Sequence, residues 1–98
     1  MKYDVKMQQD NDIKRAKFNK ILGQVIKNIR IKDDYISISK LAREYDLDRG
    51  NLSKLERGIN GCNIVTAWKI CEAANIKFSE FAKLLEKELG KDFKFTDE

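Results

Sequence analysis

Apolar residues along this chain recur mostly three and four positions apart, a spacing that predicts amphipathic helices rather than strands. The first predicted helix runs from about Asp12 to Ile31, and its lysines mostly face away from its apolar side. Because the chain has no proline and only five glycines, the ends of the later helices are predicted from capping residues. The apolar stripe of the first helix consists of Phe18, Ile21, Leu22, Val25, Ile26 and Ile29.

A short second helix is predicted after the loop formed by residues 32–35. Ser37 suits its N-cap, since a serine oxygen can accept a hydrogen bond from a backbone N–H of the first turn. This helix turns Leu41 and Ala42 inward and ends near Tyr45. A tight turn over residues 46–48 follows, with Leu47 filling the angle between this helix and the next.

The third predicted helix begins after Asp48, which suits its N-cap, and ends at Gly58, which can adopt the positive φ that closes many helices. Leu52 and Leu55 share its inner face. Glu56 also turns toward the body of the protein, where a half-buried carboxylate needs a cation. Arg30, at the end of the first helix, is our candidate for that cation.

Two further helices complete the pattern, separated from the third by a loop over residues 59–63. Asn63 suits the N-cap of the fourth helix and Asn75 ends it, with Trp68 expected to pack at the edge of the core. Its buried residues are predicted to be Ile64, Ala67, Ile70, Cys71 and Ala74. The fifth helix spans about residues 78–89 before Gly90, with Phe78, Phe81, Ala82, Leu85 and Leu89 on one side.

The chain is therefore predicted to be all-α, a compact five-helix bundle with one domain over residues 12–90. Residues 1–11 lack helical periodicity and are interpreted as an N-terminal arm, its mobility left open. Residues 91–98 form a C-terminal tail in which Phe93 and Phe95 alternate with charged residues. These two aromatics either fold back on the body or meet a second subunit, and we favour the second subunit.

The amino-acid composition excludes several classes of function for this chain. The chain has no histidine, which excludes His-based nucleophile systems and nearly all zinc sites, and it has no phosphate-binding glycine loop. We therefore expect no enzymatic activity, no cofactor and no metal. No apolar run is long enough to span a bilayer and no segment resembles a signal peptide, so we expect a cytoplasmic protein with reduced cysteines and no membrane partner.

The charge balance favours a polyanionic partner. The net charge is +4, and the basic excess lies in residues 1–36, whereas residues 62–90 are balanced. With Leu52 and Leu55 inward, the outer face of the third helix presents Gly50, Lys54 and Arg57, flanked by Arg49, Asn51 and Ser53. Arginine and lysine can donate hydrogen bonds to guanine, and asparagine can form two hydrogen bonds with adenine. This face therefore suits the major groove of double-stranded DNA. The competing interpretation is a solvated charged face on a small bundle.

Residues 36–58 carry a resemblance to a known family. The pair Leu41-Ala42, the turn leucine Leu47, the run Leu55-Glu56-Arg57-Gly58 and the helix pair that follows resemble the lambda-repressor-like, or Cro/XRE-type, helix-turn-helix family. The similarity covers about residues 22–81. Ile38 stands where the family often has glutamine, Gly50 offers no side chain to a base, and Cys62 stands where proline is common.

The resemblance implies sequence-specific DNA binding by a homodimer on two half-sites, in a protein of bacterial or phage origin. It also implies an internal ion pair between Arg30 and Glu56. Base-reading positions are, by the same match, Arg49, Gly50, Asn51 and Lys54. Helix N-termini and backbone amides add phosphate contacts. The residues that we expect to contact phosphates are Ser37, Ser39, Lys40, Ser53, Arg57 and Asn60.

Three functions remain open. The leading hypothesis is a transcriptional regulator that acts as a repressor, with its regulation supplied by assembly or by another protein such as an anti-repressor. The second is an antitoxin that uses the same domain on its own operator and binds a toxin with its terminal extensions. The third is a helical protein-interaction module without DNA binding, for which Ile38 and Gly50 are the only support.

Overall fold

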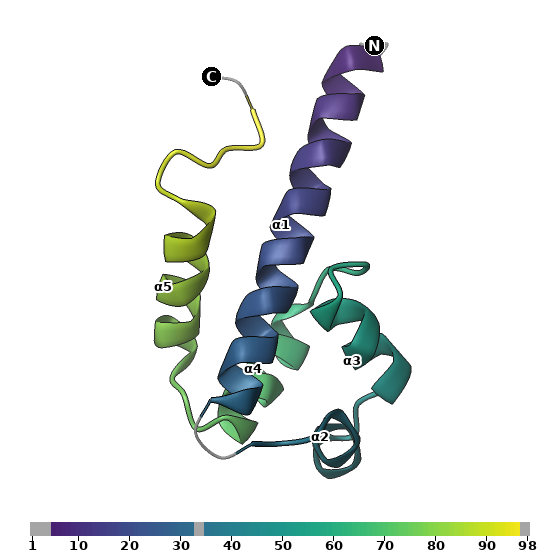
Figure 1. Cartoon of the computed structure of the whole chain (residues 1–98), viewed down its shortest axis with the longest axis vertical. Coiled ribbons are helices and arrows are strands. Elements are labelled where there is room, and N and C mark those ends of the chain that lie inside the picture. The colour runs from purple at the N-terminus through teal and green to yellow at the C-terminus, as the bar shows by residue number, and fades with distance from the viewer. Residues whose placement is uncertain (1–4, 33–34, 97–98) are drawn as a thin grey trace.

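The computed structural model describes residues 5–32 and 35–96, with side chains described from Asn11 onward. These residues form five helices and no strand, so the predicted all-α fold is confirmed, and none of these helices is long and apolar enough to cross a bilayer. The helices are α1 (Val5–Ile31), α2 (Ile38–Tyr45), α3 (Arg49–Glu56), α4 (Ile64–Ala73) and α5 (Phe78–Leu89). The second half of α1 packs among the other helices, while its first half projects beyond α3 and α4 (Figure 1).

The start of α1 differs from the prediction. It begins at Val5 rather than Asp12, so residues 5–11 of the predicted arm are helical, and residues 1–4 lie outside the described residues. Residues 5–11 contain no proline or glycine, and lysine, methionine and glutamine have high helix propensity. A helix that is already nucleated can therefore extend through them. Apolar periodicity missed this segment because periodicity reports burial on one face, not helical backbone.

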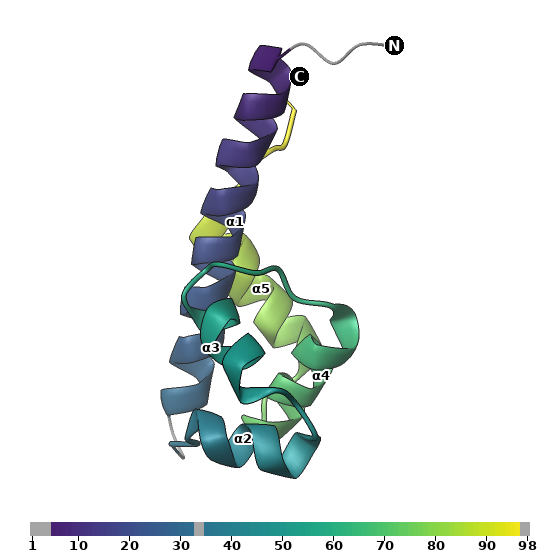
Figure 2. The ribbon, with the colours of Figure 1, turned by 90° about the vertical axis from the view of Figure 1, so that its right-hand side faces the viewer.

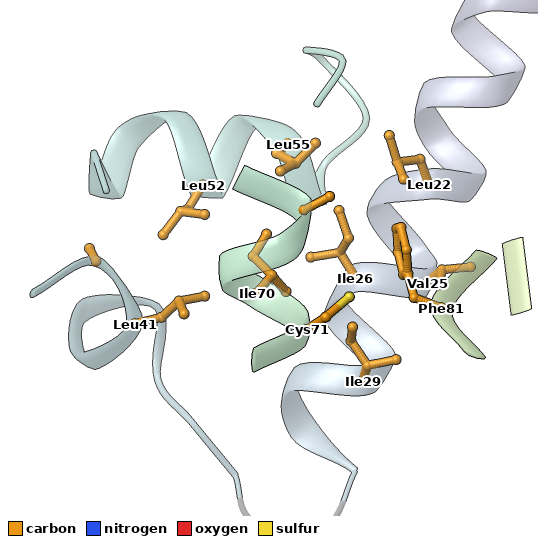
Figure 3. Packing of buried hydrophobic residues seen from close by; sticks show 12 residues of the cluster. Leu22, Val25, Ile26, Ile29, Leu41, Leu52, Leu55, Ile70, Cys71 and Phe81 are labelled. Carbon is orange, nitrogen blue, oxygen red and sulfur yellow. The ribbon is translucent and has the colours of Figure 1, made fainter. Parts of the chain in front are cut away.

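The core lies where all five helices meet (Figure 3). Ile26 of α1, Leu41 of α2 and Ile70 of α4 are the largest fully buried side chains. The predicted stripe of α1 is confirmed in its second half, and Leu47 packs against the core as expected. The remaining members of the core are Leu22, Val25, Ile29, Ala42, Leu52, Leu55, Ala67, Cys71 and Phe81. Each helix after α1 therefore contributes one narrow face to a single core.

The prediction that Ile64 of α4 is buried is wrong. Ile64, the first residue of the helix, is 68% exposed, because Ala67, Ile70 and Cys71 already fill the inner face. Trp68 stacks on Phe78 with ring centroids 5.8 Å apart, yet it stays 57% exposed. The outer side of α4 is thus far more apolar than a solvated helix face usually is.

The two cysteines are free thiols. Cys71 is buried, as its helical position predicted. Burial raises the pKa of the Cys62 thiol to about 11, and burial also raises the pKa of Cys71. Both thiols are therefore protonated near neutral pH, which slows their oxidation and alkylation because the thiolate is the reactive form.

The C-terminal tail folds back on α1. The ring of Phe18 lies 6.0 Å from that of Phe93 and 5.9 Å from that of Phe95, and Lys17 Nζ lies 5.8 Å from the Phe93 ring centroid. The tail runs from the end of α5 back toward the projecting part of α1 in both views (Figures 1 and 2). We favoured a second subunit as the partner of these rings, but the structure shows that they pack on α1 of the same chain.

Two glycines bring the backbone of α1 against the end of α3. A Cβ atom at Gly23 would lie 2.4 Å from Leu55 O and 2.6 Å from Glu56 O, both backbone atoms. A Cβ atom at Gly58, whose φ is +77°, would lie 2.7 Å from the Cα atom of Lys20. Only glycine allows this approach, so the end of α3 is placed by direct backbone contact with α1.

Substitution of Gly23 by alanine tests this contact. Alanine normally stabilises a helix interior by about 1 kcal/mol relative to glycine. Here we expect the reverse, a loss of about 2 kcal/mol or more in the free energy of unfolding, because the clash is with backbone that cannot turn away. Urea unfolding followed by circular dichroism measures the change.

Gly61→Ala is the matched control, because a Cβ atom there would make only an ordinary 3.6 Å contact with Asn19 Oδ1. We expect it to change stability by less than about 0.5 kcal/mol. Equal effects of the two substitutions would contradict the close approach of α1 and α3.

The aromatic cluster of the tail is tested by a double-mutant cycle. The effects of Phe18→Ala and Phe93→Ala on the free energy of unfolding should be coupled by about 0.5 to 1.5 kcal/mol, because either substitution removes the contact between the two rings. Phe18→Ala combined with Trp68→Ala should instead be additive, since Trp68 stacks on Phe78. Additivity of the Phe18 and Phe93 substitutions in thermal unfolding would mean that the tail does not pack on α1.

Candidate nucleic-acid interface

The α2–turn–α3 unit is held by local capping bonds that the sequence predicted. Ser37 Oγ accepts from the Lys40 N–H at 3.1 Å, and Asp48 Oδ1 accepts from the Asn51 N–H at 2.8 Å. Between the helices, Asp46 adopts a left-handed conformation with φ of 53°. These bonds use N–H groups that a helix terminus leaves without partners, so they fix where each helix begins.

The end of α3 is closed by two backbone bonds around Gly58. The Gly58 N–H donates to Leu55 O at 3.1 Å, and the Ile59 N–H donates to Lys54 O at 2.9 Å. This pair of bonds with a left-handed glycine is a Schellman motif, which ends a helix sharply and redirects the chain. The same glycine touches α1, so one residue both ends α3 and fixes its position.

The predicted ion pair between Arg30 and Glu56 is present and largely shielded from solvent. Arg30 Nε donates to Glu56 Oε2 at 2.6 Å, Arg30 Nη2 donates to Glu56 Oε1 at 2.9 Å, and both side chains are 7% exposed. Arg30 Nη1 also donates to the Ile36 carbonyl at 2.6 Å, just before α2. The hydrogen bond to Glu56 is the main reason that the pKa of Arg30 is raised above its ordinary value.

The outer face of α3 is open to solvent. Arg49, Gly50, Asn51 and Lys54 are all exposed, while Leu52 and Leu55 on the inner face are 2% and 3% exposed. The four predicted base-reading residues therefore share one short exposed helix. α2 and α3 lie next to each other on one side of the bundle (Figures 1 and 2).

The structure gives a reason for glycine at position 50 that the sequence did not reveal. A Cβ atom at this position would lie 3.2 Å from Asp48 Oδ1, the oxygen that caps α3. A larger residue would crowd the cap. Ile38, the other unusual residue of the motif, packs against the core and so belongs to the fold rather than to the exposed face.

The six residues assigned to phosphate contacts differ in their exposure to solvent. Lys40, Arg57 and Asn60 are exposed, whereas Ser37, Ser39 and Ser53 are partly buried. Two of them already make bonds within the chain, since Ser37 caps α2 and Arg57 Nε donates to Ser53 O at 3.3 Å. Arg57 must therefore release this bond or use its terminal nitrogens to reach a phosphate.

A polar hollow of about 250 Å³ lies between α3 and the loop that follows it. Its lining includes Asn51, Asn60 and Asn63, together with the α3 cap Asp48. Asn51 and Asn60, predicted for bases and for phosphates respectively, are thus neighbours across this hollow. Sequence reasoning missed this arrangement, since only the path of the loop brings residues of the two elements together. It also missed Gly23, although a glycine inside a helical pattern is a known sign of close packing.

Comparison with known proteins agrees with the geometry. A family model described as a Cro/C1-type HTH DNA-binding domain matches residues 25–87, which run from the second half of α1 to the last turns of α5. No curated protein matches the chain. The match includes the capped helix pair, the exposed face of α3 and the Arg30–Glu56 pair. The chain therefore belongs to the family of Cro/C1-type HTH DNA-binding domains.

Proposed function

We propose that this chain is a sequence-specific transcriptional repressor that reads the major groove of double-stranded DNA with α3 and acts as a homodimer. The observation that carries the proposal is the division of α3 into two faces. Leu52 and Leu55 fix one face in the core, while Lys54 extends into solvent from the opposite face and Arg49 and Asn51 are exposed on its two flanks. A DNA-reading helix needs both, because its base contacts depend on a fixed orientation.

The exposed side chains match different atoms of the duplex. Lys54 and Arg49 donate to guanine O6 and N7, and Asn51 exchanges two hydrogen bonds with adenine. Gly50 leaves room for α3 to approach the base edges closely. Lys40 near the start of α2, with Arg57 and Asn60 after α3, contacts the phosphates on either side and sets the register of the protein on the duplex.

The homodimer follows from the size of the reading surface. An eight-residue helix can contact only a few base pairs, which is too little for useful specificity in a genome. Two copies that bind half-sites about one helical turn apart double the contacted sequence. Repression is the simplest consequence, since a bound dimer obstructs other proteins on the same DNA.

Selection from a library of random duplexes, followed by affinity measurement, tests this function. We expect an enriched motif with two-fold symmetry and an affinity that falls steeply with salt, as counterion release requires. Lys54→Glu should lower affinity for the selected motif by about a hundredfold or more, because a base contact is lost and a carboxylate faces DNA.

Lys83→Glu on α5 is the control, since it makes the same charge change on another exposed helix position. It should lower affinity only slightly and equally for all sequences. The proposal fails if no motif is enriched at low salt. It also fails if the two substitutions weaken binding equally, which would mean that only net charge matters.

A further inference from the structure

Tyr35, just before α2, packs its ring against the guanidinium of Arg30. The Cζ atom of Arg30 lies 5.6 Å from the centroid of the ring, within the distance at which an aromatic face attracts a cation. Tyr35 is 67% exposed and is not among the residues that pack against the core. The ring is therefore placed by Arg30 rather than by burial.

The side chain of Tyr35 adds to the hydrogen bonds that already hold Arg30. Glu56 binds two nitrogens of the guanidinium, and the Ile36 carbonyl binds the third. An aromatic ring attracts the charge through its electron-rich face, so it needs none of these N–H groups. The hydrogen bond to Glu56 raises the pKa of Arg30 most, and the side chain of Tyr35 raises this pKa as well. Tyr35 therefore stabilises the charged form of Arg30 beside Glu56.

Arg30 connects the start of α2 with the end of α3. Tyr35 and Ile36 both contact its guanidinium, and Ser37, the next residue along the chain, caps α2. Glu56, which binds the same guanidinium, is the last residue of α3. A change in the position of Arg30 therefore affects both helices of the α2–turn–α3 unit.

The strength of this contact limits its effect on DNA binding. A cation–π contact at an exposed ring is weak, and it can favour one orientation of α3 by no more than its own free energy. Expressed as a change in an equilibrium constant, that is about two- to fivefold. A residue that contacts DNA phosphates directly would instead weaken binding to every sequence by the same factor. Measurement on two kinds of duplex therefore distinguishes the two roles.

We propose that Tyr35 is a positioning residue for the reading of DNA, which holds Arg30 against Glu56 and so fixes the orientation of α3. The inference deepens the proposed repressor function and rests on it. Tyr35 acts through Arg30, and its role is to raise the affinity of the protein for its operator relative to other DNA. Base contacts need not involve Tyr35, because the residues expected to make them lie on α3.

Substitutions of Tyr35 test this role through the ratio of affinities for the selected operator and for random duplex. Tyr35→Ala should lower the ratio about two- to fivefold, while affinity for random duplex persists, because only the orientation of α3 is changed. Tyr35→Phe keeps the aromatic face and should keep most of the ratio. Tyr35→Leu keeps a large apolar side chain without that face, so it should behave as Tyr35→Ala does.

Ile13→Ala is the matched control, because Ile13 is similarly exposed, at 66%, and lies on α1. It should leave the ratio unchanged, and circular dichroism should show that every variant remains helical, since both positions are exposed. An unchanged ratio in Tyr35→Ala would overturn the proposal, and an equal loss of affinity for both duplexes would show a direct phosphate contact instead. A Tyr35→Leu variant that binds as the wild type does would overturn it as well.

Arg30→Lys separates this inference from the proposed function. In the Arg30→Lys background, Tyr35→Ala should lower the ratio much less, because the ring has lost the planar group that it contacts. If no sequence is bound specifically, the repressor function fails, and urea unfolding then tests the contact by itself. The shift of the urea midpoint in the double variant should be smaller than the sum of the shifts caused by Tyr35→Ala and Arg30→Lys. Additive shifts would overturn the inference.

Discussion

The guanidinium of Arg30 joins the three segments on which the rest of the structure depends. From the end of α1 it binds Glu56 of α3 with two nitrogens and the carbonyl of Ile36, just before α2, with the third. Removal of one partner from such a shielded pair costs about 3 to 5 kcal/mol, because the other charge stays buried. Gly23 adds backbone contact beside the pair. Together these interactions fix α3 relative to α1.

This constraint explains how so short a helix can hold the fixed orientation that the proposed reading of DNA requires. An isolated helix of eight residues is not stable in water. Here the caps at Asp48 and Gly58 define its ends, the two inner leucines hold it in the core, and Arg30 sets its direction. The exposed residues are therefore not needed to keep the helix ordered, which leaves them available for the proposed contact with DNA.

Local chemistry made much of this predictable from the sequence. The caps Ser37, Asp48 and Asn63 act within a few residues of themselves, and each forms the expected bond. The pairing of Arg30 with Glu56 followed from a carboxylate on the buried side of a helix and from the family resemblance. What stayed hidden or undecided depends on distant parts of the chain. The contact at Gly23 and the exposed side of α4 were not predicted, and the return of the tail to Phe18 was only one of two alternatives.

The central claim is that the α1–α3 junction orients α3, the helix proposed to read DNA, and Arg30→Lys tests it most directly. Lysine keeps the charge but cannot bind Glu56 and Ile36 with one planar group. The measurement is the ratio of affinities for the selected operator and for random duplex, by fluorescence anisotropy, on folded protein. We predict that this ratio falls about tenfold or more, the equivalent of one well-placed base contact, while affinity for random duplex persists. An unchanged ratio would contradict the account.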